Sequence, residues 1–134
     1  MTSTTQNSAL LFARILLGAL FVMAGLGKLG GVEGFAGYMA SGGVPAVLAW
    51  PVILFEILGG LALVAGLQTR AVALALGVFC IVSGVLYHFD PADQMQMTSF
   101  LKNVALAGGY LALAVVGGGR YAVDARIGGR SVAA

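Results

Sequence analysis

The sequence is poor in charged residues. Only 9% of its 134 residues are Asp, Glu, Lys or Arg, whereas about 25% are charged in ordinary soluble proteins. So few charges cannot form the polar shell of a soluble domain. The net charge of +2 is small and the basic residues are scattered, which excludes a nucleic-acid groove. A length of 134 residues allows one domain. Because 60% of the residues are hydrophobic, the composition indicates that the solvent of this domain is a lipid bilayer.

Cysteine and histidine are also scarce. Cys80 is the single cysteine, which excludes an intrachain disulfide and a C-x-x-C dithiol relay. The sequence contains no Walker A, H-E-x-x-H or G-x-S-x-G motif. A formal G-x-G-x-x-G starts at Gly25, but a hydrophobic helix precedes it and a glycine-rich loop follows it, so it is not a dinucleotide fingerprint. We therefore expect no covalently bound cofactor.

Four hydrophobic segments each have the length of about 20 residues that a membrane-spanning helix needs. They lie at about residues 9–29, 46–67, 70–89 and 99–117. The prediction is an all-α bundle of four transmembrane helices over residues 9–119. Residues 1–8 form a polar N-terminal tail that ends in a helix cap at Asn7 or Ser8, and residues 120–134 form a basic tail that is disordered beyond about Arg126. A cleaved signal peptide is rejected, since no basic residue precedes Arg14.

The connections between these segments predict their arrangement. The first connection is glycine-rich, ends at Pro45 and suits a short interfacial helix from Glu33 to Met39. The second has only about three residues, so the helices that it joins are antiparallel neighbours. The third is polar and begins at the breaker Asp90-Pro91. Lys and Arg are more frequent in the two tails and the second connection than elsewhere, which predicts that both termini are cytoplasmic.

Within the spans, polar and small residues share helix faces. On one face of the first span, polar, small and aromatic residues follow one another at intervals of four, three, four and three residues. The third and fourth spans have similar faces. The three faces comprise Arg14, Gly18, Phe21, Gly25 and Lys28; Gly77, Cys80, Gly84 and Tyr87; and Asn103, Ala107, Tyr110 and Ala114. Small residues allow helices to approach closely in lipid. We therefore expect these faces to point into the bundle.

Glu56 is an acid near the middle of the second span and is the best candidate for a catalytic residue. An ionisable group at this depth is a functional-site hypothesis by default. Basic residues on neighbouring helices could pair with it, and arginine is the better partner chemically because its planar fork matches a carboxylate. The predicted buried polar cluster, or ligand site, is Arg14, Lys28, Glu56, His88, Lys102 and Asn103. Three roles of Glu56 stay open: locking helix register, proton transfer or quinone contact, and lining a substrate pathway.

A soft metal ion is a minor alternative at the outer end of the third span. His88, Met95 and Met97 flank the third connection, and a histidine with an M-x-M motif could hold Cu(I). Methionines in a loop that dips into the membrane interface would explain the same pattern. We predict no metal site.

Several motifs follow one another in a recognisable order. R-x-x-L-G-x-x-F-x-x-A-G-x-x-K runs from Arg14 to Lys28, followed by G-V-P, E-I-L-G-G at Glu56, F-L-K-N-V-A-L-A-G-G at Phe100 and G-x-G-R-Y-A-V-D ending at Asp124. Together they resemble the DoxX family of bacterial membrane proteins over nearly the whole chain. The last motif often reads S-x-D in the family, whereas this chain has Ala122 in place of the serine.

The resemblance implies a multi-pass protein of the bacterial inner membrane. The family is named after a distant relative, a subunit of a thiosulfate:quinone oxidoreductase, and some members accompany a superoxide dismutase and a sulfurtransferase. It therefore implies an accessory or quinone-contacting subunit of a redox, sulfur or oxidative-stress complex, which would not be catalytic alone and would have soluble redox or sulfur-transfer enzymes as partners. The family's polar motif positions are Arg14, Lys28, Glu56, Arg70, Lys102, Asn103, Arg120 and Asp124. Two alternatives stay open: a small homo-oligomeric solute transporter, and a scaffold that recruits soluble enzymes through its basic tail.

Overall fold

The computed structural model describes residues 3–128, and within this range the chain is helical and contains no strand. The elements are α1 (Ser3–Lys28), η1 (Leu29–Gly31), α2 (Val32–Ser41), η2 (Ala46–Leu48), α3 (Ala49–Ala65), α4 (Thr69–Tyr87), α5 (Gln94–Val116) and α6 (Val123–Ile127). Four helical stretches of the described chain are long and apolar enough to cross a membrane: α1 with its continuation into α2, η2–α3, α4 and α5. The predicted four-span all-α fold is confirmed.

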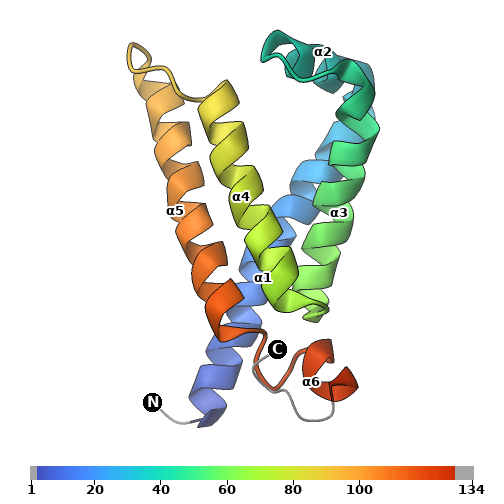
Figure 1. Cartoon of the computed structure of the whole chain (residues 1–134), viewed down its shortest axis with the longest axis vertical. Helices are drawn as coiled ribbons and strands as arrows, with labels where there is room; N and C mark the ends of the chain where they lie inside the picture. The colour runs from blue at the N-terminus through green and yellow to red at the C-terminus, as the bar shows by residue number, and fades with distance from the viewer. Residues whose placement is uncertain (1–2, 129–134) are drawn as a thin grey trace.

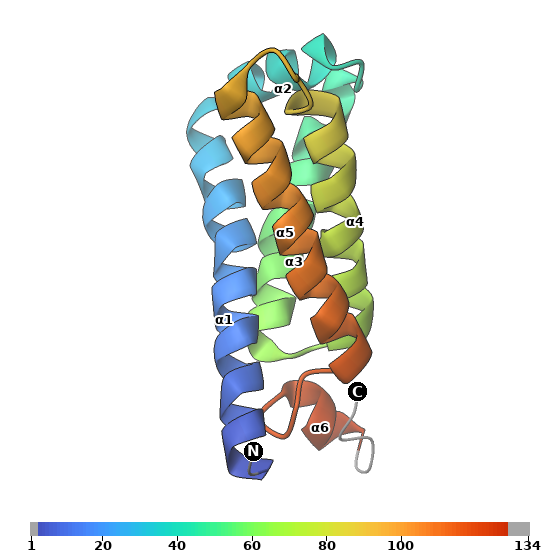
Figure 2. The same ribbon diagram turned by 90° about the vertical axis from the view of Figure 1, so that its left-hand side faces the viewer.

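The four long helices form two antiparallel pairs, α1 with α3 and α4 with α5. Figure 1 shows the pairs in contact near the lower end and diverging towards the upper end, where α2 lies. We call the upper end, with α2 and the α4–α5 connection, the loop end; the lower end, with Ser3 and α6, is the terminal end. Figure 2 shows that both ends of the described chain lie at the terminal end. Which side of the membrane this end faces stays a prediction.

Glycines set the distance between α1 and α3. A Cβ atom added to Gly18 would lie 2.6 Å from the carbonyl oxygen of Gly60, and one added to Gly60 would lie 2.6 Å from the carbonyl oxygen of Gly18. Side-chain carbons do not approach oxygen so closely, so the two helix backbones can touch only because both residues lack a side chain. The buried residues of α1 are Arg14, Gly18, Phe21 and Gly25. The face predicted from their spacing is therefore confirmed as the inner face.

The core lies between the two helix pairs. Its buried side chains are Phe21, Leu63, Ala73, Leu76, Cys80, Tyr110 and Leu113. The Tyr110 hydroxyl donates a hydrogen bond to the Leu17 carbonyl at 2.7 Å, which joins α5 to α1. Large hydrophobic residues elsewhere on the helices, such as Leu16 and Met23, are exposed to the outside. A surface of this kind suits lipid.

Two helices begin earlier than the sequence predicted. Helix α1 begins at Ser3 rather than near Ala9, so the predicted cap at Asn7 or Ser8 is wrong. The Asn7 side-chain oxygen instead accepts a hydrogen bond from the Arg120 backbone N–H at 2.9 Å. Helix α5 begins at Gln94 rather than Ser99 because the Asp93 carboxylate caps it, accepting from two backbone N–H groups.

The segment after α5 folds back under the bundle rather than hanging free. Helix α6 extends through Ile127, and the predicted disorder beyond Arg126 otherwise falls on positions 129–134, which lie outside the described residues. The Asp124 carboxylate accepts hydrogen bonds from the backbone N–H groups of Gln68, at 2.7 Å, and Thr69, at 2.8 Å. It therefore caps the start of α4 with a negative charge, where the helix dipole favours one.

Candidate functional site

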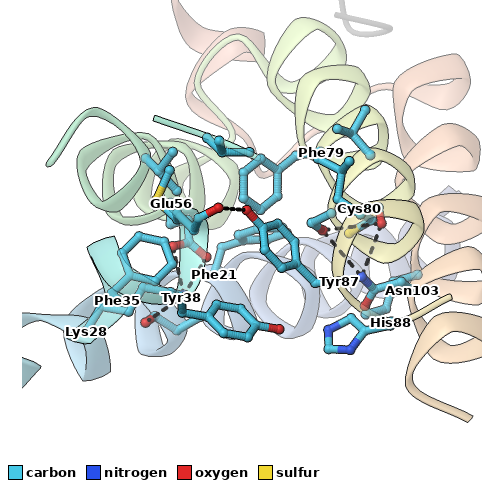
Figure 3. Close-up of a pocket in the computed structure, with 18 of the residues that line it drawn as sticks. Phe21, Lys28, Phe35, Tyr38, Glu56, Phe79, Cys80, Tyr87, His88 and Asn103 are labelled. Carbon is cyan, nitrogen blue, oxygen red and sulfur yellow. Dashed lines mark hydrogen bonds and ion pairs between the residues drawn. The ribbon is translucent and has the colours of Figure 1, made fainter. Parts of the chain in front are cut away.

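A cavity of about 470 Å³ opens where the two helix pairs diverge, in the half of the bundle nearer the loop end (Figure 3). Its walls are mostly apolar, and aromatic rings contribute much of them. The lining residues are Leu20, Phe21, Ala24 and Lys28 of α1; Phe35, Tyr38 and Met39 of α2; Val44; Val52 and Glu56 of α3; Phe79, Cys80, Val82, Ser83, Leu86 and Tyr87 of α4; His88; and Asn103 and Leu106 of α5. All four long helices and α2 therefore contribute to one site.

An ion pair forms part of one wall. The Lys28 ammonium lies 2.9 Å from Glu56 Oε1 and donates a hydrogen bond to Oε2 at 3.1 Å. The Glu56 side chain is only 4% exposed, against 27% for Lys28. Lys28 also donates to the Ala24 carbonyl at 3.3 Å, and its ammonium lies 5.1 Å from the centre of the Phe35 ring. The Lys28 side chain thus points back into the bundle, where its ammonium reaches the Glu56 carboxylate.

Side-chain chemistry favoured arginine as the partner of Glu56, and this prediction is wrong. Gly18 faces Gly60 across the α1–α3 crossing, and Gly25 faces Ile57. With this antiparallel register Glu56 lies level with Ala24, one turn from Lys28. Arg14 is ten residues from Ala24, which is about 15 Å at 1.5 Å of rise per residue. The register that the Gly18–Gly60 contact sets therefore makes Lys28, and not Arg14, the partner of Glu56.

Arg14 has a different role at the terminal end. It is fully buried, and its guanidinium donates to the Gly118 carbonyl at 3.1 Å, the Val64 carbonyl at 2.6 Å and the Tyr121 carbonyl at 3.1 Å. A longer bond of 3.4 Å reaches the Leu63 carbonyl. A positive charge at the last turn of α3 complements its dipole. Arg14 therefore joins three segments of the terminal end and does not belong to the cavity.

The opposite wall carries polar groups from α4 and α5. The Asn103 amide nitrogen donates to the Cys80 carbonyl at 3.1 Å and the Ser83 hydroxyl oxygen at 3.4 Å. His88 lies at the rim, with its Nδ1 2.9 Å from the side-chain oxygen of Gln96. Lys28, Glu56, His88 and Asn103 of the predicted cluster thus meet at the cavity. Lys102 does not line the cavity, because it lies on an exposed face of α5.

Two tyrosines outside the predicted cluster close the cavity at the loop end. The Tyr38 and Tyr87 rings stack at 4.8 Å, and the Tyr87 hydroxyl donates to the Met39 carbonyl at 2.7 Å. Gly42 lies directly against the Tyr87 ring, where a Cβ atom would collide with it. The aromatic character of α2 indicated only a helix at the membrane interface. No local pattern reveals that α2 packs on α4.

The arrangement does not favour the soft-metal alternative. Met95 and Met97 lie on the first turns of α5 rather than in a loop, and residues two apart on a helix point about 200° apart. Met95 is 81% exposed, and His88 is engaged by Gln96. Across residues 3–128 no three His, Cys, Asp or Glu side chains lie together as a metal-binding group.

Comparison with known proteins gives three relatives and one family. The sequence model of the DoxX family matches residues 9–89. The inner membrane protein YqjF of Escherichia coli (strain K12) is 40% identical over 89% of this chain and 92% of its own length. The inner membrane protein YphA of the same organism is 32% identical over 87% of this chain and 89% of its own. CatD of Bacillus subtilis (strain 168), named provisionally as an oxidoreductase, is 36% identical over 46% of each chain.

No solved structure matches the chain significantly.

Proposed function

The chain belongs to the DoxX family, and from this premise and the cavity at the loop end we propose that it is a quinone-contacting subunit of a redox complex in the bacterial inner membrane. The observation that carries the proposal is the buried Lys28–Glu56 pair in the wall of an otherwise apolar, aromatic cavity. A charge at this depth is costly unless it is paired, and such groups mark ligand pathways in membrane proteins.

The cavity suits a lipophilic ring with polar atoms on its edge. Its volume falls in the range of ligand pockets, about 300–1,000 Å³. The rings of Phe21, Phe35 and Phe79 supply faces against which a flat head group can pack, and the polar groups on α1, α3 and α5 lie around them. Leu20 and Val82 line the cavity and are also exposed to the outside. A ligand dissolved in the bilayer could enter beside them.

Electron transfer would require a partner. The sequence has one histidine and one cysteine, so it holds neither facing histidine pairs for a haem nor a dithiol. The partial similarity to CatD, which is named provisionally as an oxidoreductase, supports a redox setting. We propose that a soluble redox or sulfur-transfer enzyme is the electron donor or acceptor, and that this chain holds the lipid-soluble carrier.

Thermal unfolding in lipid nanodiscs tests the proposal. A decyl-substituted benzoquinone, added as an equal mixture of oxidised and reduced forms, should raise the melting temperature, because a ligand that binds only the folded state stabilises it. The variant Ala24→Phe fills the cavity with a phenyl ring and should abolish the shift. Met23→Phe places the same ring on the exposed face of α1 and should keep it. No shift of the unaltered protein at saturating ligand contradicts the proposal.

A further inference from the structure

The hydrogen-bonding groups that line the cavity differ in whether they already have a partner: the donors contrast with the acceptors. The donors on the Lys28, Tyr87 and Asn103 side chains are largely engaged. Two of the three Lys28 ammonium hydrogens go to the Ala24 carbonyl and Glu56 Oε2, and the Tyr87 hydroxyl donates to the Met39 carbonyl. The Asn103 amide nitrogen uses both its hydrogens, on the Cys80 carbonyl and the Ser83 hydroxyl oxygen.

The acceptors are not engaged. Glu56 Oε1 is buried and receives no hydrogen bond from any described residue, although it lies 2.9 Å from the Lys28 ammonium and is held there by charge. The Asn103 side-chain nitrogen faces the Cys80 carbonyl, which can only accept a hydrogen bond. The orientation of the Asn103 amide is therefore fixed, and its side-chain oxygen is left as an acceptor. That oxygen has no donor within residues 3–128. Figure 3 shows Glu56 and Asn103 on opposite walls.

A ligand that bridges Glu56 Oε1 and the Asn103 carbonyl oxygen must therefore donate a hydrogen bond to each of them. The oxidised and reduced forms of a quinone differ in this property: the quinone presents two carbonyl acceptors, whereas the quinol presents two hydroxyl donors. A hydroxyl that donates to a carboxylate makes a short and strong hydrogen bond. A quinone carbonyl brought to the same oxygen would be repelled by it.

Resting on the proposed function, we propose that the cavity selects the reduced, dihydroxy form of the carrier, with Glu56 Oε1 accepting from one hydroxyl and the Asn103 carbonyl oxygen able to accept from the other. Lys28 is the positioning residue, because its ion pair holds the Glu56 carboxylate in place. A tenfold preference for the reduced form would raise the two-electron potential of the bound couple by about 30 mV. The chain would thus retain the quinol until a partner oxidises it.

Binding of three probes to the full chain in nanodiscs, measured by titration calorimetry, tests this inference. The probes are a decyl-substituted benzoquinone, its quinol, and the quinol with both hydroxyls methylated. The quinol should bind at least tenfold more tightly than either of the others, because only the quinol can donate. The methylated probe keeps the ring and the tail, so it separates donation from shape without any change to the protein.

Variants locate the preference. In Lys28→Met/Glu56→Gln the charged acceptor is replaced by an amide without leaving a lone charge, and the quinol-to-quinone ratio should fall to about one. Glu33→Gln removes an exposed carboxylate of α2 outside the cavity and should leave the ratio unchanged. Equal or tighter binding of the quinone to the unaltered chain, or a preference that survives the double change, overturns this inference alone. Binding of none of the probes overturns the proposed function as well.

Discussion

At the scale of single residues, the two basic side chains of α1 show how the same helix face serves two purposes. Arg14 ends in a ring of backbone carbonyls at the terminal end, and Lys28 ends on a carboxylate at the cavity. The planar fork of arginine supplies several donors in fixed directions, which suits several carbonyls. The compact ammonium of lysine needs only one strong partner. Each side chain therefore matches its surroundings.

Removing the Arg14 side-chain charge should destabilise the protein strongly. Arg14→Met leaves the Gly118, Val64 and Tyr121 carbonyls without the donor that Arg14 supplies, and each buried acceptor that loses its partner costs roughly 1–3 kcal/mol. We expect the free energy of unfolding to fall by about 3 kcal/mol or more, measured by denaturant titration in mixed micelles. Arg120→Met is the control, because that side chain is exposed. Equal effects of both changes would show that the buried hydrogen bonds contribute little.

The Lys28–Glu56 pair should behave as a coupled unit. Lys28→Met leaves an unpaired buried carboxylate and should lower the melting temperature, as should Glu56→Gln, which leaves an unpaired ammonium. Breaking one partner of a buried pair typically costs about 3–5 kcal/mol, whereas replacing both is often nearly neutral. The double variant should therefore recover most of the lost stability. Additive losses in this double-mutant cycle would argue against a direct pair.

At the scale of elements, the crossing of α1 and α3 depends on two glycines. Gly60→Ala places a methyl group 2.6 Å from the Gly18 carbonyl oxygen, so the helices must separate. We expect a loss of about 1–3 kcal/mol, which is typical of overpacking, in the denaturant titration described above. Gly27→Ala is the control, since no atom lies within 4 Å of its Cβ position and alanine favours a helix by up to about 1 kcal/mol. Tolerance of Gly60→Ala would show that the backbones do not touch.

Helix α2 closes the cavity partly through one hydrogen bond, and breaking it should loosen the closure. Tyr87→Phe removes the bond to the Met39 carbonyl but keeps the ring stacked on Tyr38. Because such a hydrogen bond is worth about 1 kcal/mol, its loss should raise the population of the open state about fivefold. Cys80, a buried residue of the cavity wall, reports opening through its rate of modification by N-ethylmaleimide. Tyr121→Phe, at the other end, should leave the rate unchanged, and an unchanged rate in Tyr87→Phe would refute the closure.

At the scale of the whole molecule, the four membrane-spanning helices could be predicted from the sequence, whereas α6 was missed and the site could be predicted only in part. A span needs only hydrophobic length, and a buried face needs only the helical spacing of small residues. The partner of Glu56 depends on the register of α1 against α3, which the Gly18–Gly60 contact sets in three dimensions. Likewise the contact of Tyr87 with α2 joins segments 48 residues apart.

The orientation of the molecule in the membrane is a prediction that labelling can test. With the terminal end cytoplasmic, Ser41 at the end of α2 lies on the periplasmic side. In a Cys80→Ala background, Ser41→Cys should react with a membrane-impermeant maleimide added to intact spheroplasts. Ile127→Cys, which is exposed on α6, should react only after the membrane is opened. The reverse pattern would invert the topology.

The ring of carbonyls around Arg14 also has a consequence for biogenesis. Arg14 enters the membrane with the first helix, but Gly118 and Tyr121, which accept two of its hydrogen bonds, are translated more than 100 residues later. Until the ribosome has delivered them, the first helix carries a cation whose partners are incomplete. A chain that stops before the segment after α5 therefore keeps within its bundle a cation that lacks two of its carbonyl partners.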